Sequence, residues 1–161
     1  MGDAKPRIAV HKLSSCDGCQ LAFLDLGEDL IRLNELVDIA HFAEAGMVDP
    51  EAEVDIAFVE GSVSSAEEAE RIQRVRAHAG VLVTIGACAT SGGIQALRNL
   101  NDGEQWLADV YPSPEFVDSL AHSTGIAENV HVDYELWGCP INSRQVLAAT
   151  RALLWGVPPV A

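Results

Sequence analysis

The sequence predicts a doubly wound α/β fold, with helices on both faces of a parallel sheet of four or five strands, in three αβα layers. Short apolar runs alternate along the chain with amphipathic stretches, which is the pattern of βαβ units. The middle runs are apolar at nearly every position, as expected for strands covered on both faces. Cysteines directly follow three of the runs. We expect a single domain over residues 1–161.

The first elements follow from apolar runs and helical periodicity. We expect strands over residues 8–13, 36–42 and 54–59, and a helix over residues 20–33 that begins after a pair of cysteines. This helix has two apolar stripes, whereas a surface helix usually has one. The stripes are Phe23, Leu26, Leu30 and Leu33, and Leu21, Leu24 and Ile31. Either a long loop of the same domain or another subunit covers the second stripe.

A capping signal marks the next helix. Ser64 or Ser65 stands three residues before a glutamate, which is the spacing of a capping box, and the helix continues to about residue 79. Gly80 is expected to end it. Residues 81–85 are then the fourth strand.

The remaining elements are less regular. We expect a helix over residues 94–100, a strand over 130–136 and a helix over 143–154. Residues 101–128 are polar and contain prolines, so no element is assigned there. Together, the elements predict the strand order 2-1-3-4-5 of a flavodoxin-like sheet.

Composition argues against several classes of function. Ten Lys and Arg stand against 24 Asp and Glu, and a formal charge of -14 disfavours nucleic acids and anionic membranes as partners. No apolar stretch approaches the roughly 18 residues of a membrane span. The first seven residues lack the pattern of a signal peptide, so we expect a cytoplasmic protein without structural disulfides. Neither G-x-G-x-x-G nor a P-loop is present, so any nicotinamide or flavin would belong to a partner.

Four cysteines are the strongest functional signal. Cys16 and Cys19 form a C-x-G-C pair after the first strand, Cys88 follows the fourth strand, and Cys139 follows the last. In a parallel sheet these strand ends share one edge, where ligands bind. Four thiolates are the ligands that a [4Fe–4S] cluster requires. The helix that begins after Cys19 also directs its positive dipole end toward such an anionic group.

Three other interpretations of the cysteines stay open at this point. Zinc would accept four thiolates, although structural zinc sites usually have two close pairs. A thiol–disulfide oxidoreductase would use Cys16 and Cys19 alone, which leaves Cys88 and Cys139 without a role. In the third interpretation, the four cysteines are buried residues with no shared role.

Four short segments, taken together and in order, point to a family. They are Cys16-Asp-Gly-Cys19, Val59-Glu60-Gly61-Ser62-Val63, Gly86-Ala87-Cys88-Ala89 with Gly92-Gly93, and Gly138-Cys139-Pro140. In these segments the chain resembles the small, electron-transfer subunit of [NiFe] hydrogenases. The resemblance implies a flavodoxin-like fold and one proximal [4Fe–4S] cluster. Its ligands would be Cys16, Cys19, Cys88 and Cys139, with no catalytic residue in this chain.

The resemblance also implies partners. A separate large subunit would hold the nickel–iron centre at which H2 is reversibly oxidised, and the cluster would relay electrons to NAD(P)-, flavin- or ferredoxin-linked subunits. The chain lacks the further cysteines of longer members, and so resembles the short small subunits of soluble cytoplasmic hydrogenases. The cluster subunit of respiratory complex I is similar as well, but it has a tandem cysteine pair instead of a spaced one.

Several other residues carry narrower expectations. Glu60 ends a buried strand, so it lies at a subunit interface with a proton-linked role or is bonded to backbone amides. Gly92 and Gly93 either permit a close approach to the cluster or a partner, or form a plain turn. His11 is expected to be a core histidine. The tryptophans Trp106, Trp137 and Trp155 are expected to pack in the protein.

Overall fold

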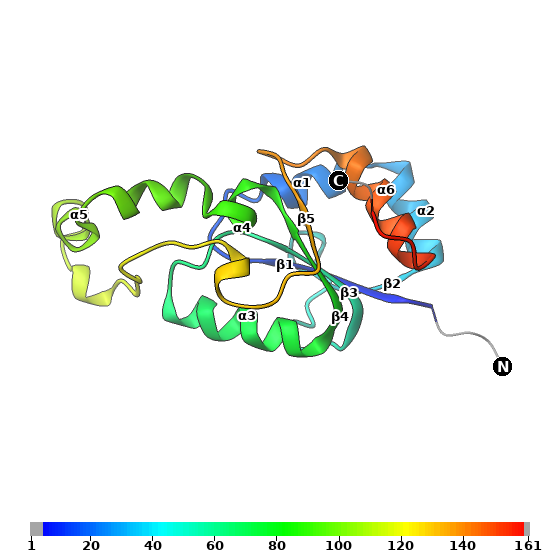
Figure 1. Ribbon diagram of the computed structural model, residues 1–161, viewed down its shortest axis with the longest axis horizontal. Coiled ribbons are helices and arrows are strands. Elements are labelled where there is room, and N and C mark those ends of the chain that lie inside the picture. Colours follow the sequence, from blue (N-terminus) through cyan, green and yellow to red (C-terminus); the bar gives the residue numbers. More distant parts are fainter. Residues whose placement is uncertain (1–4, 160–161) are drawn as a thin grey trace.

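The computed structural model describes residues 5–159, which fold around one five-stranded sheet (Figure 1). The strands are β1 (Arg7–Lys12), β2 (Asp38–Phe42), β3 (Val54–Glu60), β4 (Ala79–Ile85) and β5 (Tyr134–Leu136). They lie in the order β2-β1-β3-β4-β5, and each neighbouring pair is parallel. The predicted fold class and strand order are therefore confirmed.

Helices cover both faces of this sheet (Figure 1). The α-helices are α1 (Gly18–Leu24), α2 (Glu28–Leu36), α3 (Ala66–His78), α4 (Gly86–Ser91), α5 (Gly103–Val110) and α6 (Ser143–Leu154). The 3₁₀ helices are η1 (Ala43–Ala45), η2 (Gly93–Leu100), η3 (Pro114–Phe116) and η4 (Ile126–Glu128). Helices α1, α2 and α6 lie on one face, and α3 lies on the other.

Two hydrophobic cores separate these layers, because successive residues of a strand point to opposite faces of the sheet. Ile56 and Phe58 of β3 belong to the core under α1, α2 and α6. Ala57 and Val59, which alternate with them, belong to the core under α3. This arrangement explains why β3 is apolar at nearly every position.

The prediction of one helix over residues 20–33 is wrong. Two helices form, and Gly27 between them has φ 56° and ψ -119°, a conformation that residues with side chains rarely adopt. A tight turn joins the helices, since the Gly27 N–H donates to the Leu24 carbonyl at 3.1 Å. Leu21 and Ile31 of the second apolar stripe are 51% and 67% exposed. Among residues 5–159, no loop covers these two side chains.

The role predicted for Gly80 is also wrong, whereas the start of α3 is confirmed. Helix α3 ends at His78, and Gly80 lies within β4. A Cβ atom at Gly80 would lie 2.9 Å from the carbonyl oxygen of Asp55 in β3, so the glycine permits the two strands to pair closely. At the other end of α3, the Ser65 side chain accepts the Glu68 N–H at 3.2 Å, which is one half of a capping box, and the Glu68 carboxylate accepts the Ser64 N–H at 2.8 Å.

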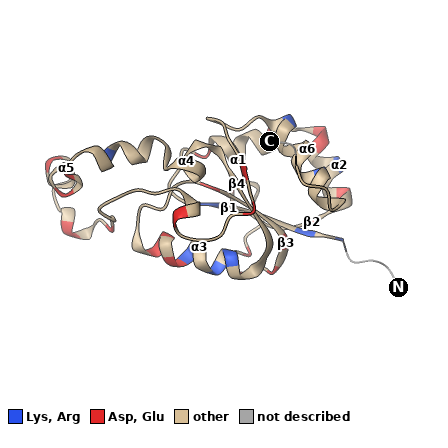
Figure 2. Cartoon of the chain, in the orientation of Figure 1, with Lys and Arg blue, Asp and Glu red and all other residues tan. Residues whose placement is uncertain are grey.

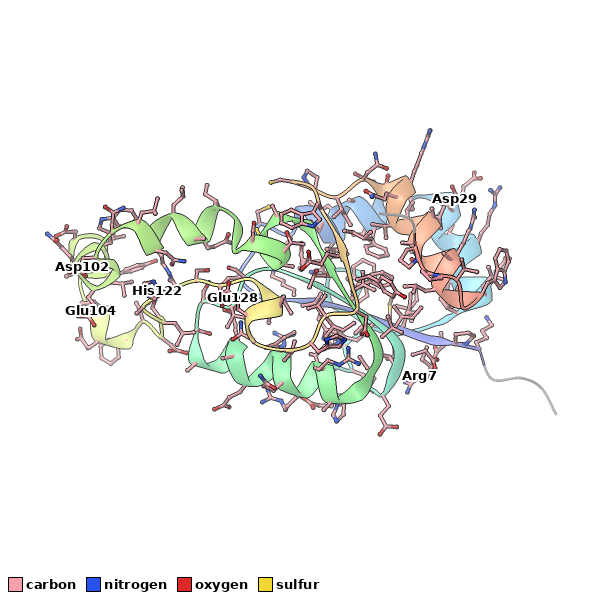
Figure 3. All side chains as sticks on the ribbon, viewed as in Figure 1. Arg7, Asp29, Asp102, Glu104, His122 and Glu128 are labelled. Carbon is pink, nitrogen blue, oxygen red and sulfur yellow. The ribbon has the colours of Figure 1, made fainter. Side chains whose placement is uncertain are left out.

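The last third of the chain contains an extension from the sheet. The helix expected over residues 94–100 is the 3₁₀ helix η2, and the strand expected over 130–136 shortens to β5, whereas α6 has the predicted bounds. We call residues 93–119 the arm. It comprises η2, α5 and η3, which project away from the sheet (Figure 1). Asp102 and Glu104 lie at its far end (Figure 3).

The surface departs from one expectation. Trp106, Trp137 and Trp155 are 46%, 57% and 81% exposed, so the prediction that they pack within the chain is wrong. Acidic residues are spread over most elements of the chain, whereas several arginines lie on α3 (Figure 2). Within residues 5–159, no helix has the length and apolar character needed to cross a bilayer. The expectation that the first seven residues form no signal peptide concerns mainly residues 1–4, which lie outside the described residues.

Candidate functional site

All four cysteines lie at the carboxyl edge of the sheet, which we call the cysteine edge. Cys16 and Cys19 follow β1, Cys88 lies in α4 directly after β4, and Cys139 follows β5. All four are free thiols. Cys19 is buried, Cys88 is partly buried, and Cys16 and Cys139 are exposed. The four cysteines therefore lie at one edge, with two thiols inside the fold and two at its surface.

The thiols are close enough to affect each other's ionisation. Burial raises the pKa of Cys19 to about 12, and the nearby charges of Glu60 and Cys88 add to this increase. Burial also raises the pKa of Cys88, and the charges of Cys16 and Cys139 act in the same direction. Metal binding deprotonates thiols, so a bound cation would relieve the repulsion that four neighbouring thiolates create.

Glycines provide the space around two of the sulfur atoms. At Gly86, with φ 84°, a Cβ atom would overlap the sulfur of Cys19. At Gly93, with φ 57°, it would lie 2.6 Å from the Cys88 sulfur. A Cβ at Gly92 would instead meet Ala96 at 2.9 Å. Gly93 thus permits a close approach to a cysteine, as one interpretation predicts, and Gly92 forms the turn between α4 and the arm.

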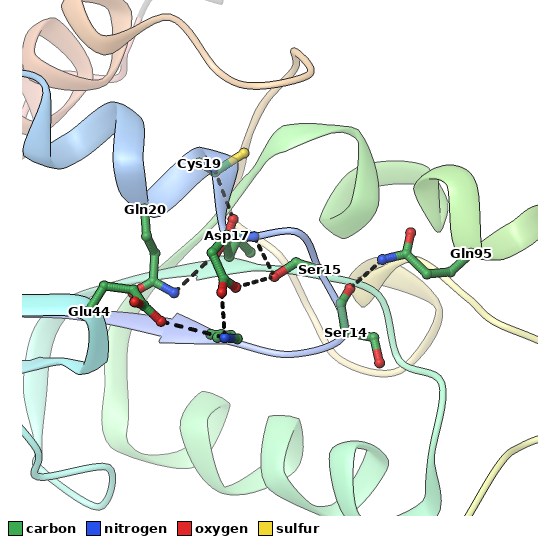
Figure 4. Close-up of polar contacts among 9 residues, drawn as sticks. Ser14, Ser15, Asp17, Cys19, Gln20, Glu44 and Gln95 are labelled. Atoms are coloured by element: carbon green, nitrogen blue, oxygen red, sulfur yellow. Dashed lines mark hydrogen bonds and ion pairs between the residues drawn. The ribbon is translucent and has the colours of Figure 1, made fainter.

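The loop that carries Cys16 is held by polar contacts (Figure 4). Lys12 Nζ lies 2.6 Å from Asp17 Oδ2, and the hydroxyl of Ser15 donates to Asp17 Oδ1 at 3.1 Å. Asp17 itself has a left-handed φ of 67°, which aspartate tolerates better than most residues. These contacts fix the backbone on both sides of Cys16.

Glu60 connects β3 to the same loop. Its side chain is 2% exposed, and its carboxylate accepts the Cys19 N–H at 3.2 Å and the Gln20 Nε2–H at 3.0 Å (Figure 4). Burial raises the pKa of Glu60, and these hydrogen bonds oppose the increase. The expected bonding to backbone amides is found, together with a side-chain amide. A proton-linked role for Glu60 stays a prediction.

His11 lies in the core, as expected, but it has a partner that the sequence analysis missed. Its ring stacks on His41 of β2, with centroids 4.6 Å apart, and both residues are 2% exposed. Burial lowers the pKa of His11 to about 3, so the ring is neutral at physiological pH. The neutral stacked pair packs as an aromatic core element. Pattern reasoning could have found His41, because strands β1 and β2 are neighbours.

The donor set of four thiols suits a cluster better than a single ion. Among residues 5–159, no three His, Cys, Asp or Glu side chains are arranged to hold one metal ion. A zinc ion would need its thiolates about 2.3 Å from one centre. An iron–sulfur cubane is a larger body that each thiolate meets at a different iron. Four thiols at one edge of the sheet, with glycines beside the sulfurs of Cys19 and Cys88, suit such a group.

Comparison with known proteins gives one family over most of the chain. A family model described as NADH ubiquinone oxidoreductase, 20 Kd subunit, matches residues 16–153. The NAD-reducing hydrogenase HoxS subunit delta of Cupriavidus necator is 30% identical over 171 residues, covering 97% of this chain and 82% of that protein. Sulfhydrogenase 2 subunit delta of Pyrococcus furiosus is 28% identical, and the chain covers 65% of its length.

Solved structures agree with this family. A chain in the crystal structure of an NAD+-reducing [NiFe]-hydrogenase in the H2-reduced state has a TM-score of 0.89 and 34% identity. The match covers 98% of this chain and 95% of that one. A Ni-Fe-Se hydrogenase from Desulfomicrobium baculatum has a TM-score of 0.65 at 16% identity, covering 93% of this chain and 63% of that one, which indicates a shared fold.

Proposed function

The chain belongs to the family described as NADH ubiquinone oxidoreductase, 20 Kd subunit, and we propose that it is the electron-transfer subunit of a cytoplasmic [NiFe] hydrogenase. Its relatives are named hydrogenase subunits, so the resemblance indicated by the four motifs is confirmed. One structural observation carries the proposal. Four free cysteines from three separate segments gather at the carboxyl edge of a sheet that is otherwise closely packed.

Cys16, Cys19, Cys88 and Cys139 would bind one [4Fe–4S] cluster, which accepts and donates single electrons when it is bound. The chain itself holds the thiols in place and excludes water from one side. Cys19 is anchored through its backbone amide to Glu60, and its sulfur lies against Gly86. Cys139 is exposed, so this part of the site is open to another protein.

The partner proposed for the cysteine edge is the large subunit, which would contain the nickel–iron centre. Electrons tunnel only over short distances, so donor and acceptor must both approach the cluster. The arm offers a docking surface directly behind Cys88. Ile94, Leu97 and Leu100, which we call the apolar stripe, are 76%, 55% and 79% exposed. Residues three apart eclipse in a 3₁₀ helix, so these side chains form one row.

Exposed apolar rows of this kind mark sites of protein interaction. The stripe begins next to Gly93, which contacts Cys88, so a subunit seated on it also reaches the cluster. On the opposite flank, Leu21 and Trp137 are 51% and 57% exposed beside Cys19 and Cys139. A second subunit that accepts the electrons, of NAD(P)-, flavin- or ferredoxin-linked type, has access there.

A complex I-type role is the second candidate, because the family description itself names an NADH ubiquinone oxidoreductase. Two observations favour the hydrogenase. The chain has a spaced Cys16–Cys19 pair, and hydrogenase subunits match it along more than nine-tenths of its length. An assembled complex that reacts with quinone but not with H2 would favour the second candidate.

The test uses the full chain purified without oxygen together with its co-expressed partner subunits. We expect about four irons and four sulfides per chain, a low-temperature EPR signal after dithionite reduction, and a nickel-containing subunit in the complex. Zinc without iron would contradict the cluster. Absence of iron together with a reversible Cys16–Cys19 disulfide would instead support a thiol–disulfide oxidoreductase.

A further inference from the structure

The outer part of the arm carries large apolar side chains that this chain leaves uncovered. We call residues 101–119, which contain α5 and η3, the tip (Figure 1). In α5 only Gly103 and Leu107 are partly buried, and all its other residues are exposed. A helix of eight residues is marginal in water by itself, so this one gains from a partner that covers it. Four large apolar side chains of the tip are 46%, 70%, 48% and 85% exposed: Trp106, Val110, Tyr111 and Phe116.

A pocket of about 260 Å³ lies between α5 and the base of the arm. Trp106 and Val110 are four residues apart in α5, so they lie on the same face of the helix. Arg98 also lines the pocket, but its guanidinium already donates to the Ser119 hydroxyl at 2.9 Å and to the Ser64 carbonyl at 3.0 Å. Because this wall is positively charged, the pocket favours an apolar group over a cation. The lining includes Arg98, Trp106, Leu107, Val110, Tyr111 and Ser119.

The base of the arm is fixed to the domain by hydrogen bonds, so the pocket exists before a partner arrives. Asn99 Nδ2 donates to the Ser123 carbonyl at 2.7 Å, and the Ser123 N–H donates to Asn99 Oδ1 at 2.8 Å. The buried Ser123 hydroxyl lies 3.0 Å from that of Ser62 and 2.8 Å from that of Ser64. A surface that is already ordered avoids part of the entropic cost of binding.

Charge distinguishes the tip from the apolar stripe. Residues 101–119 contain five acidic residues and no Lys or Arg, whereas residues 93–100 contain no acidic residue. Four of the five are next in the chain to residues that line the pocket, namely Gly103, Val110 and Ser119. The pocket therefore has an acidic rim. All five are exposed (Figure 2): Asp102, Glu104, Asp109, Glu115 and Asp118.

We infer that the tip is a docking surface for a basic segment of a partner subunit, which inserts an apolar side chain into the pocket and places Lys or Arg beside the acidic rim. The exposed rings of Trp106 and Tyr111 add to this preference, because cations bind over aromatic faces. A second copy of this chain is disfavoured by its own formal charge of -14. The inference rests on the proposed function, because the partner belongs to that complex, but it requires no bound cluster.

Two sets of variants separate charge from apolar contact at the tip. Asp109→Lys with Glu115→Lys reverses two exposed carboxylates and leaves the Asp102 cap of α5 in place. Its matched control is Glu35→Lys with Glu70→Lys, which changes the net charge equally at exposed positions of α2 and α3. Trp106→Ala removes the aromatic wall of the pocket and changes no charge.

The measurement is the affinity of the full chain for the co-expressed partner subunits, by surface binding at about 0.1 M and about 1 M salt. We expect the tip reversal to weaken binding by about tenfold or more at the lower salt and by less at the higher, because salt screens charge. Trp106→Ala should weaken it by about tenfold at both. The control pair should bind as the wild type does.

Hydrogen exchange of the wild type provides a readout without any substitution. We expect the amides of α5 to exchange more slowly in the complex than in the free chain. Equal exchange in the two states would overturn the inference, as would wild-type affinity in the tip reversal or an equal loss in the control pair. If Trp106→Ala unfolds α5, the reversed pair decides. Dimerisation of the purified chain that the tip reversal abolishes would assign the tip to a second copy, and would also overturn the inference.

Failure of the proposed function has a different signature. A complex that forms without iron overturns the proposed cluster, while the affinities of the tip variants still decide the inference. A complex that contains iron and whose affinity does not respond to the tip variants overturns the inference alone. A chain that binds no partner subunit overturns both.

Discussion

The cysteine edge and the arm are built in opposite ways. At the edge, glycines leave room for sulfur atoms, and the buried Glu60 carboxylate accepts hydrogen bonds from Cys19 and Gln20 of α1. In the arm, neither η2 nor α5 has a buried residue, and apolar side chains face solvent. The comparison teaches that this chain's own contacts build the inner part of the edge around Cys19 and Cys88, whereas the arm leaves its apolar side chains uncovered.

The largest effect is expected from the cysteines themselves. Changing any one of Cys16, Cys19, Cys88 or Cys139 to serine removes a thiolate, so we expect the loss of most iron and of electron transfer to the partner subunits. Iron per chain and the EPR signal of the reduced protein measure this. Full iron content in one of the four variants would remove that cysteine from the ligand set.

Two glycines with the same φ angle test how tightly the edge is built. Gly86 and Gly46 both have φ 84°, but nothing lies within 4 Å of a Cβ at Gly46, whereas a Cβ at Gly86 overlaps the Cys19 sulfur. We expect Gly46→Ala to cost about 1–2 kcal/mol of unfolding free energy through backbone strain alone. Gly86→Ala should cost about 1–3 kcal/mol more, and it should also lower the iron content.

Urea unfolding monitored by circular dichroism gives both free energies, and iron analysis accompanies it. Equal losses of stability in the two variants, with iron unchanged in both, would show that the sulfur is not confined as described.

The apolar stripe of the arm provides the reverse test. Leu97→Asp places a charge in an exposed row, so we expect the unfolding free energy to change by no more than about 0.5 kcal/mol. Binding to the large subunit should weaken by about tenfold or more, since buried charge is costly at an interface. Val48→Asp is the control, because Val48 is 71% exposed but lies outside the arm.

Co-purification and surface binding measurements with the large subunit decide this prediction. Equal affinities for the two variants would mean that the stripe is not the docking surface. A large loss of stability in Leu97→Asp would mean that the arm is more tightly packed than its exposure indicates.

The smallest effect concerns the far end of the arm. Asp102 accepts the Glu104 and Gln105 N–H groups at 3.1 and 3.2 Å and so caps α5. Asp102→Ala should cost about 1 kcal/mol, confined to α5. Hydrogen exchange should become faster in α5 only, with no change in iron. Faster exchange around Cys88 would contradict the separation of arm and edge.

The sheet and the cysteine positions could be predicted because both depend on local patterns. Continuous apolar runs indicated β3 and β4, and the Ser65–Glu68 spacing indicated α3. The approach of cysteines followed from the rule that parallel strands share an edge. In contrast, Gln95 Nε2 donates to the Ser14 carbonyl at 2.7 Å only because the folded arm brings the two residues together, so no local pattern connects them.

The errors have physical reasons as well. Helical periodicity continues across Gly27, and only its positive φ breaks the helix. The tryptophans are apolar, and hydropathy does not distinguish a side chain packed in its own chain from one left for a partner. The exposure of the three tryptophans therefore shows which apolar side chains this chain leaves uncovered.

The placement of the cysteines has a consequence for biosynthesis. Cys16 follows the first strand of the sheet and Cys139 the last, so the complete set exists only after β5 has joined β4. A ribosome-bound chain that ends before β5 offers at most three thiols, and cannot hold a cubane in full. With the proposed cluster, iron retention would report that β5 has joined the sheet, which would make cofactor insertion a late checkpoint in the folding of this domain.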